Sequence, residues 1–194
     1  QVQARIIDVL DTAQYIHVLG QKGNRTDLTV RLQAPQDPAA QTIFENCVAD
    51  VNIPVGEVFT TPALSGTEGT LHVTGVYLNG LYFEDLEIRF ADGRIAQYRC
   101  GGFPTEDEGK KYIEENILFH HETLPMGECA IGTNTTAAAL AARLGILERL
   151  PILIAEKTGP HFAVGDTCYS HEEENRVFNP DGKEIFAKDN DYSL

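Results

Sequence analysis

The sequence predicts an α+β fold, in which a mixed, largely antiparallel sheet with meander connectivity packs against about three helices. Two hydrophobic patterns support this prediction. Between residues 70 and 100, apolar and polar side chains alternate and turn signals interrupt the alternation, as is typical of antiparallel strands. Outside this region, apolar residues recur at helical spacing behind helix-start signals. We expect residues 1–194 to form a single domain with a sizeable core.

The N-terminal segment predicts a short helix and a pair of strands. Residues 1–11 have the pattern of the end of a helix. Tyr15–Leu19 and Leu28–Leu32 have the composition of strands, and the turn between them falls at Gly23-Asn24.

A second helix is predicted after Asp37-Pro38, because aspartate caps helix N-termini and proline suits the first helical position. The apolar residues behind this start recur at helical spacing; they are Ala40, Ile43, Phe44, Cys47, Val48 and Val51. Asn52-Ile-Pro54 ends the predicted helix, since proline disfavours helical geometry in the residue before it. Glu57 is then expected just after a helix end, on a short strand.

Residues 70–100 contain the clearest strand signals. Asn79-Gly80 is the dipeptide that two-residue hairpin turns prefer. Three apolar residues, Leu86, Ile88 and Phe90, alternate with charged neighbours, which indicates one buried face and one solvated face. Asp92-Gly93 then turns the chain into a further strand over residues 95–100.

The remaining elements are helices, a strand and a final hairpin. Thr105 begins a capping-box pattern, with Ile113, Ile117 and His120 expected on one face of the helix behind it. Residues 135–149 predict another helix, which Pro151 stops. The apolar run at residues 152–155 is expected to be a strand that leads toward His161. Asn179-Pro-Asp-Gly182 predicts a turn between two last strands.

Composition restricts the possible functions. The net charge of −14 argues against a nucleic-acid partner, because nucleic-acid binders carry basic patches. The sequence contains neither an apolar run near the roughly 20 residues of a membrane span nor a signal-peptide pattern. Its four cysteines are widely spaced and lack a C-x-x-C pair, which predicts reduced thiols and a cytoplasmic location. Because the chain opens without methionine and ends without a terminal signal, we expect it to be an excised piece of a longer protein.

Three ionisable residues are the main site candidates: Glu57, Glu128 and His161. Each lies in a short apolar segment that is flanked by glycines, where a charged group is costly unless it is paired or bound to metal. Carboxylates and neutral imidazoles are also the ligands that hydrolase metals use. We therefore expect one shared site for a divalent cation. Tyr169 follows His161 closely and presents a phenol beside it.

Other candidates have weaker support. His120 and His121 are explained by a helix C-terminus and His171 by a solvated acidic turn, while His17 and His72 lie in strand patterns. Glu156 and Asp166 flank His161 and either one is a possible partner that orients its imidazole. Cys168 is a conceivable nucleophile, but nothing in the sequence indicates a lowered thiol pKa. The chain has no Gly-x-Ser-x-Gly and no phosphate-binding glycine loop.

Taken together, three segments resemble the thermophilic-type metalloaminopeptidases, the family of aminopeptidase T and aminopeptidase S. They are Asn52-Ile-Pro-Val-Gly-Glu-Val-Phe-Thr60, Gly127-Glu-Cys-Ala-Ile-Gly-Thr-Asn134, and Glu156-Lys-Thr-Gly-Pro-His-Phe-Ala-Val-Gly165 continuing to Tyr169. The resemblance spans nearly the whole chain and the segments occur in the family's order. It implies part of the catalytic C-terminal domain of a two-domain, cytoplasmic, often dimeric enzyme that removes N-terminal residues from peptides.

The resemblance also implies site roles. Glu57 resembles the family's first metal-binding glutamate, Glu128 the second, bridging one, and His161 the first histidine ligand of two divalent ions (zinc, cobalt or magnesium). Glu128 would also be a catalytic base, and Tyr169 resembles the tyrosine close to the metals, although its spacing from the histidine is one residue longer. The family's later His-x-Asp segment and its N-terminal domain have no counterpart here, so we expect this fragment to be inactive alone.

The expected partners are a peptide with a free N-terminus and a second copy of the chain in a homodimer, with no nucleic acid and no membrane. Two alternatives remain at this point. One is a non-catalytic binding or dimerisation module that retains the fold, and the other is a metallohydrolase that acts on a different substrate.

Overall fold

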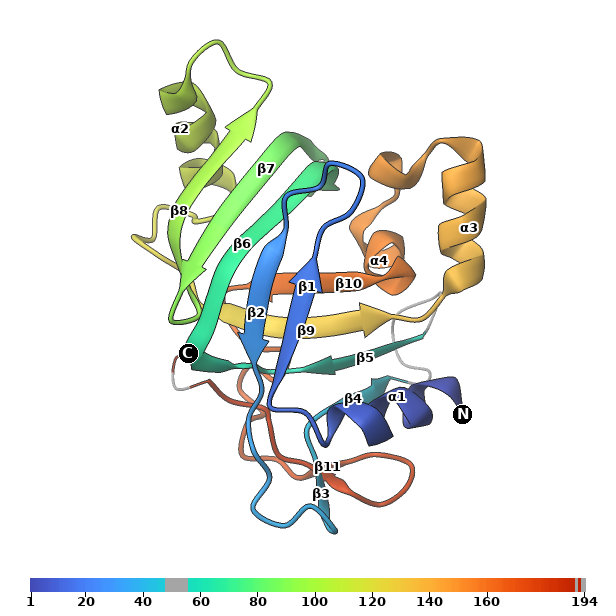
Figure 1. The fold of residues 1–194 in the computed structure, drawn as a ribbon. Helices are drawn as coiled ribbons and strands as arrows, with labels where there is room; N and C mark the ends of the chain where they lie inside the picture. The colour runs from blue at the N-terminus through green and yellow to red at the C-terminus, as the bar shows by residue number, and fades with distance from the viewer. Residues whose placement is uncertain (48–55, 191, 193–194) are drawn as a thin grey trace.

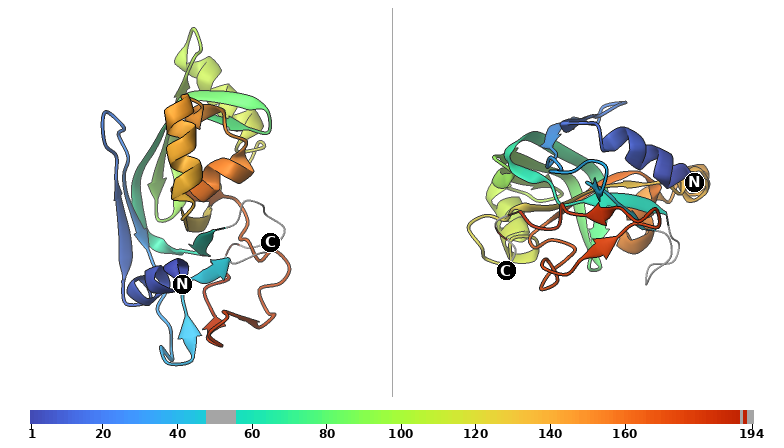
Figure 2. Two further views of the ribbon diagram at one scale, coloured as in Figure 1. Left: turned by 90° about the vertical axis from the view of Figure 1, so that its right-hand side faces the viewer. Right: turned by 90° about the horizontal axis from the view of Figure 1, so that it is seen from below.

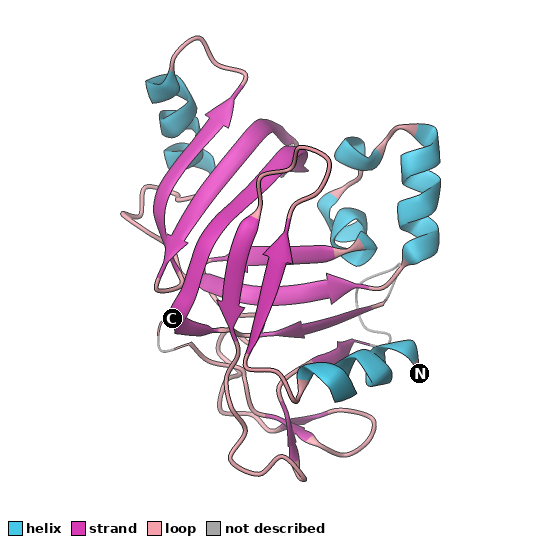
Figure 3. Ribbon diagram, in the orientation of Figure 1, coloured by secondary structure: helices cyan, strands magenta, loops and turns pink. Residues whose placement is uncertain are grey.

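The computed structural model describes residues 1–47, 56–190 and 192. Within them, three sheets and several short helices form the α+β architecture that the sequence predicts (Figure 3). No helix in the described ranges is both long and apolar enough to cross a membrane.

The largest sheet has five antiparallel strands in the order β1-β2-β6-β7-β8. Their bounds are β1 Tyr15–Leu19, β2 Asp27–Arg31, β6 Ala63–Leu78, β7 Leu81–Ala91 and β8 Arg94–Gly101. The predicted hairpin turn at Asn79-Gly80 is confirmed, since both residues have positive φ and Leu78 pairs with Leu81. The turn at Asp92-Gly93 has the same character. Leu86, Ile88 and Phe90 are buried, as their alternation predicts.

A second sheet runs across the first and carries Glu57, Glu128 and His161 (Figure 1). Its antiparallel strands have the order β10-β9-β5-β4, with bounds β4 Glu45–Cys47, β5 Glu57–Thr60, β9 Met126–Gly132 and β10 Pro160–Val164. The larger hydrophobic cluster fills the space between the two sheets, because it combines Leu28, Val30 and Phe83 of the first with Met126 and Cys129 of the second.

A small third sheet joins distant parts of the chain. β3 (Gln41–Thr42) pairs in parallel with β12 (Glu184–Ile185), which pairs with β11 (Val177–Phe178) through the predicted turn at residues 179–182. Figure 2 shows these C-terminal strands beside β3 at one end of the molecule. A second hydrophobic cluster lies close by and includes Ile43, Phe44 and Val58.

The helices lie at the periphery of the sheets (Figure 1). α1 (Val2–Leu10) covers β5 and β4, and α2 (Glu106–Asn116) packs on β8. The capping prediction for α2 is confirmed, because the Thr105 hydroxyl accepts a hydrogen bond from the Glu108 N–H. α3 (Thr135–Leu144) leads through a 3₁₀ turn, Leu147–Arg149, to the single-turn helix α4 (Ile152–Ala155) and a second 3₁₀ turn, Glu156–Thr158.

The predicted helix after Asp37-Pro38 is wrong within the described residues. The Asp37 carboxylate accepts a hydrogen bond from the Ala39 N–H and caps a turn, and the chain continues into β3 and β4. Ile43 and Phe44 are buried in a cluster with Ile7 of α1, Val58 of β5 and Ala187 near the C-terminus, so tertiary packing rather than helical periodicity sets their spacing. The rest of that prediction, from Val48 to Pro54, lies outside the described residues.

Three smaller predictions also need correction. The run at residues 152–155 is helix α4 rather than a strand, since four apolar residues do not distinguish the two. The helix predicted over 135–149 ends at Leu144, where Gly145 adopts the left-handed conformation that closes helices. His120 is exposed and lies beyond the end of α2, so it does not share the buried face of Ile113.

Candidate metal centre

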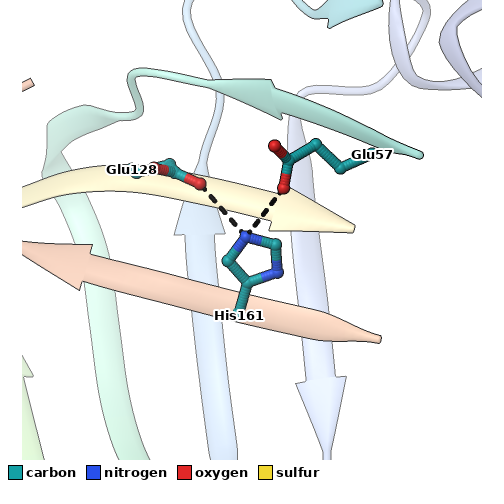
Figure 4. Close-up of side chains that lie close together, drawn as sticks. All are labelled: Glu57, Glu128 and His161. Atoms are coloured by element: carbon teal, nitrogen blue, oxygen red, sulfur yellow. Dashed lines mark ion pairs between the residues drawn. The ribbon is translucent and has the colours of Figure 1, made fainter. Parts of the chain in front are cut away.

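Strand register brings Glu57, Glu128 and His161 together. They lie on β5, β9 and β10, three adjacent strands of the second sheet. Glu57 pairs with Gly132, and His161 pairs with Ala130. Directly paired residues share a face, and residues 128, 130 and 132 share a face because side chains alternate along a strand. All three side chains therefore project from one face of the sheet (Figure 4).

The three side chains converge on one nitrogen. Nε2 of His161 lies 3.2 Å from Oε2 of Glu57 and 3.2 Å from Oε1 of Glu128. One ligand atom from each residue lies within 4.8 Å of the other two. The exposed side-chain fractions are 7%, 15% and 19% for Glu57, Glu128 and His161, so the group is largely shielded from water.

Glu57 carries a buried oxygen whose hydrogen-bonding capacity is unused. Within the described residues, its Oε2 is buried and has no hydrogen-bond partner of good geometry. A buried acceptor without any partner costs about 1–3 kcal/mol, and the ion pair with His161 at 3.2 Å offsets only part of that cost here. A divalent cation bound by this oxygen would remove that cost, and two carboxylates with an imidazole are a suitable ligand set for one. The residues present therefore fit a metal ion.

The cluster also shifts the proton affinities of its members. Burial would lower the pKa of His161, but Glu128 and Glu57 outweigh it and raise that pKa to about 9. Burial would raise the pKa of Glu57, but the contacts with His161 and Lys157 hold it below its usual value. Without a metal, a proton on His161 thus balances part of the carboxylate charge.

Nδ1 of the imidazole has a separate partner. It lies 3.1 Å from the Gly159 carbonyl oxygen, to which it donates. This hydrogen bond leaves Nε2 as the nitrogen that faces the carboxylates. Glu156, which the sequence offered as an orienting partner, instead pairs with Lys157 at 2.9 Å, and the Asp166 carboxylate accepts a hydrogen bond from the Thr167 N–H.

Lys157 is a site residue that the sequence reasoning missed. Its side chain is 1% exposed, and its ammonium contacts Oε1 of Glu57 as well as Glu156. Glu57 lies 100 positions before Lys157 in the sequence, so no local pattern could have identified this pair.

Tyr169 and Cys168 approach the cluster differently from what the sequence predicts. The phenol of Tyr169 is buried and donates to the carboxylate of Glu45, a residue not selected from the sequence. The thiol of Cys168 lies 2.7 Å from Oε2 of Glu128. Although Cys168 is exposed as a residue, burial of its sulfur and the nearby Glu128 raise the pKa of this thiol, which does not favour a thiolate nucleophile. The part of Tyr169 in catalysis stays a prediction.

The remaining histidines lie outside this cluster. His17 forms an exposed pair with Asp27 at 2.8 Å. His72 is buried in the first sheet, where Nδ1 accepts from the Arg25 N–H and Nε2 donates to Asp85 at 2.8 Å. All four cysteines are free thiols.

Comparison with known proteins adds two findings. Residues 1–183 match the sequence model of a family described as thermophilic metalloprotease (M29). The structure is similar to that of wild-type AmpT from Thermus thermophilus, with a TM-score of 0.53 and 20% sequence identity over 84% of this chain and 39% of that chain. At this identity the likeness concerns the fold, and the chain spans well under half the length of AmpT. No curated protein matches the sequence.

Proposed function

Because this chain belongs to the thermophilic metalloprotease (M29) family, we propose that Glu57, Glu128 and His161 are divalent-metal ligands of an aminopeptidase. One observation carries the proposal: three ligand atoms from three adjacent strands lie within 4.8 Å of one another. One of them, Oε2 of Glu57, is buried and makes no hydrogen bond within the described residues. The name of the structural neighbour, AmpT, agrees with an aminopeptidase rather than another hydrolase.

Each residue would have a separate role in the reaction. Oε2 of Glu57, Oε1 of Glu128 and Nε2 of His161 hold the metal, which supplies Lewis acidity and lowers the pKa of water when it is bound. The Gly159 carbonyl keeps the imidazole in the tautomer that ligation needs. Glu128, or a neighbouring carboxylate if both oxygens of Glu128 hold metal, would act as the general base that moves the proton of the attacking water. Tyr169 would turn its hydroxyl from the Glu45 carboxylate, to which it donates in this structure, and donate to the developing oxyanion instead.

We further propose that Glu128 would hold two divalent ions, one with each carboxylate oxygen. Its two oxygens face different neighbours, since Oε1 lies 3.2 Å from His161 and Oε2 lies 2.7 Å from Cys168. A carboxylate oriented in this way can serve two cations at once, which helps to stabilise both the attacking and the leaving oxygen. Zinc, cobalt and magnesium are the candidate ions. With three such ligands for two ions within residues 1–47, 56–190 and 192, we expect weak metal binding and little or no turnover from this chain by itself.

The proposed substrate is a peptide with a free N-terminus, and the proposed setting is a cytoplasmic homodimer that forms part of a longer enzyme. The direct test is calorimetric titration of the metal-free chain with zinc or cobalt. We expect binding that Glu57→Gln combined with His161→Ala abolishes. A matched control is His17→Ala combined with Asp27→Asn, which removes an exposed histidine–carboxylate pair of the first sheet. Affinity that is equal in all three proteins would reject the site assignment.

Activity is tested separately, with aminoacyl-anilides and added cobalt or zinc, on this chain and on a longer form of the protein. Hydrolysis that a chelator abolishes supports the aminopeptidase. Hydrolysis of amides or esters that lack a free amine would indicate a different metallohydrolase.

A second candidate function is a non-catalytic binding or dimerisation module. One observation favours it: large aliphatic side chains are exposed along α3, the first 3₁₀ turn and α4, namely Leu140, Leu144, Leu147, Ile152 and Leu153. Large apolar side chains that gather on a surface mark interaction sites, and these five lie on elements that follow one another in the chain. In the longer form of the protein, metal binding without hydrolysis would favour this module over the aminopeptidase.

A further inference from the structure

Lys157 occupies an unusual place for a lysine. Its side chain is 1% exposed, although lysine is almost never fully buried unless it is paired. The pairing is present: the ammonium contacts Oε1 of Glu57 and lies 2.9 Å from Oε1 of Glu156. One of these partners is a residue that we propose as a metal ligand, and the lysine holds the oxygen that faces away from His161.

The backbone is shaped to put the lysine there. Lys157 lies in the 3₁₀ turn Glu156–Thr158, which packs directly on β9 at Gly132. A Cβ atom at Gly132 would overlap the carbonyl oxygen of Glu156 and the carbonyl carbon of Lys157. Hydrogen bonds fix the turn on both sides, from the Gly132 N–H to the Gly159 oxygen at 2.8 Å and from the Asn134 N–H to the Lys157 oxygen at 2.9 Å. The ammonium therefore has a defined position relative to Glu57.

Resting on the proposed metal site, we propose that Lys157 is a positioning residue that makes Glu57 a one-oxygen ligand. The ammonium takes Oε1, and Oε2 is left buried, without a good hydrogen bond, 3.2 Å from Nε2 of His161. A lysine suits this task because its ammonium is a compact point charge, whereas an arginine would engage both oxygens of a carboxylate.

The same ammonium is a fixed positive charge beside the cation site. It offsets part of the negative charge of Glu57, Glu128 and Glu156 before any metal binds. It also repels an incoming cation, because like charges that share a low-dielectric surrounding interact strongly. Removing it should leave Glu57 free to chelate with both oxygens and should remove the repulsion, and both effects strengthen metal binding.

The test is Lys157→Met, which keeps the length and apolar stem of the side chain and removes the charge. Measured at pH 8 by competition with a chelator, the variant should bind zinc or cobalt about tenfold more tightly than the wild type, or more. Bound cobalt should also show weaker visible absorption, since an added ligand oxygen moves the ion away from tetrahedral geometry. A residue with only a structural role would cause neither change. The matched control is Lys110→Met, which removes the lysine of another lysine–glutamate pair, Lys110–Glu106, and should leave both readouts unchanged.

Folding of the variant is part of the test. Without metal, Lys157→Met should be less stable, because Glu57 loses its buried counter-charge. Zinc should restore the fold in circular dichroism, since the ion replaces the missing positive charge. A variant that stays unfolded with zinc, or that binds zinc no more tightly than the wild type does, would overturn the inference. If the wild type itself binds no metal, the proposed function fails first, and the two failures are thereby distinguished.

Discussion

At the scale of single residues, the site depends on one nitrogen shared by two carboxylates. Nε2 of His161 is equally distant from Glu57 and Glu128, and their charge raises the pKa of the imidazole to about 9. Near neutral pH the nitrogen therefore carries a proton. A metal ion needs the neutral imidazole, so binding must release that proton.

Metal affinity is consequently expected to depend on pH. Below pH 9 the imidazole is increasingly protonated, so the affinity for zinc should fall by about tenfold per pH unit from pH 8.5 to 6.5. Calorimetry in buffers of different ionisation enthalpy should count one proton released per ion bound at pH 7.5. Affinity that stays constant over this range would contradict the assignment of His161 as a ligand.

The sequence could identify some of the site residues and not others. Glu57, Glu128 and His161 stood out because a charged group among apolar residues and glycines needs a partner, and the structure brings these three together. Lys157 and Glu45 gave no such signal, since Glu57, which pairs with Lys157, and Tyr169, which pairs with Glu45, lie on distant segments. Cys168, rather than Tyr169, contacts Glu128, because neighbouring residues in a turn can face different ways.

At the scale of elements, predictions succeeded where the cause was local. The hairpin at Asn79-Gly80 was predictable because its residues themselves favour the positive φ that the turn requires. Residues 37–47 were not, because burial of Ile43 and Phe44 depends on the C-terminal strands and on α1, which the local pattern does not contain. The helix predicted over residues 135–149 was too long, because Gly145 ends it in the left-handed conformation. The run at residues 152–155 was assigned to the wrong element, because four apolar residues are too few to distinguish a strand from a helix.

The contact between β9 and the 3₁₀ turn Glu156–Thr158 gives a prediction at this scale. Gly132→Ala places a methyl group where the turn packs, so unfolding free energy should drop by about 1–3 kcal/mol. Metal affinity should change as well, because Lys157 and Glu57 move apart. The measurement is urea unfolding followed by zinc titration.

Gly159→Ala is the matched control for this substitution. Gly159 is extended and has open space where a Cβ would lie, so this substitution should change the unfolding free energy of the protein by less than about 0.5 kcal/mol. Equal effects at the two positions would show that the close approach at Gly132 is not the cause.

At the scale of the whole molecule, the site ties together segments that are far apart in the sequence. Along the sequence, Glu57 lies before the long β6–β8 meander and Glu128 lies after it, while His161 follows the helical segment α3–α4 (Figure 1). A ligand that binds only where these strands are assembled stabilises the whole fold.

Zinc should therefore raise the stability of the entire chain. At a free concentration of 100 times the Kd, the unfolding free energy should increase by about 2.7 kcal/mol. Thermal unfolding with zinc and with a chelator measures this difference, and Glu57→Gln should remove most of it. A melting temperature that does not respond to zinc would show that these ligands are not assembled in solution.

The shared face of β5, β9 and β10 has a consequence for how the length of this chain can vary among relatives. In a paired strand, one inserted or deleted residue exchanges the two faces for everything beyond it. A single extra residue between Glu128 and Ala130 would turn Glu128 away from His161 while every side chain kept its identity. Changes of length are therefore expected in the connection between β9 and β10, where α3 and α4 lie, and not within the strands that carry the three residues.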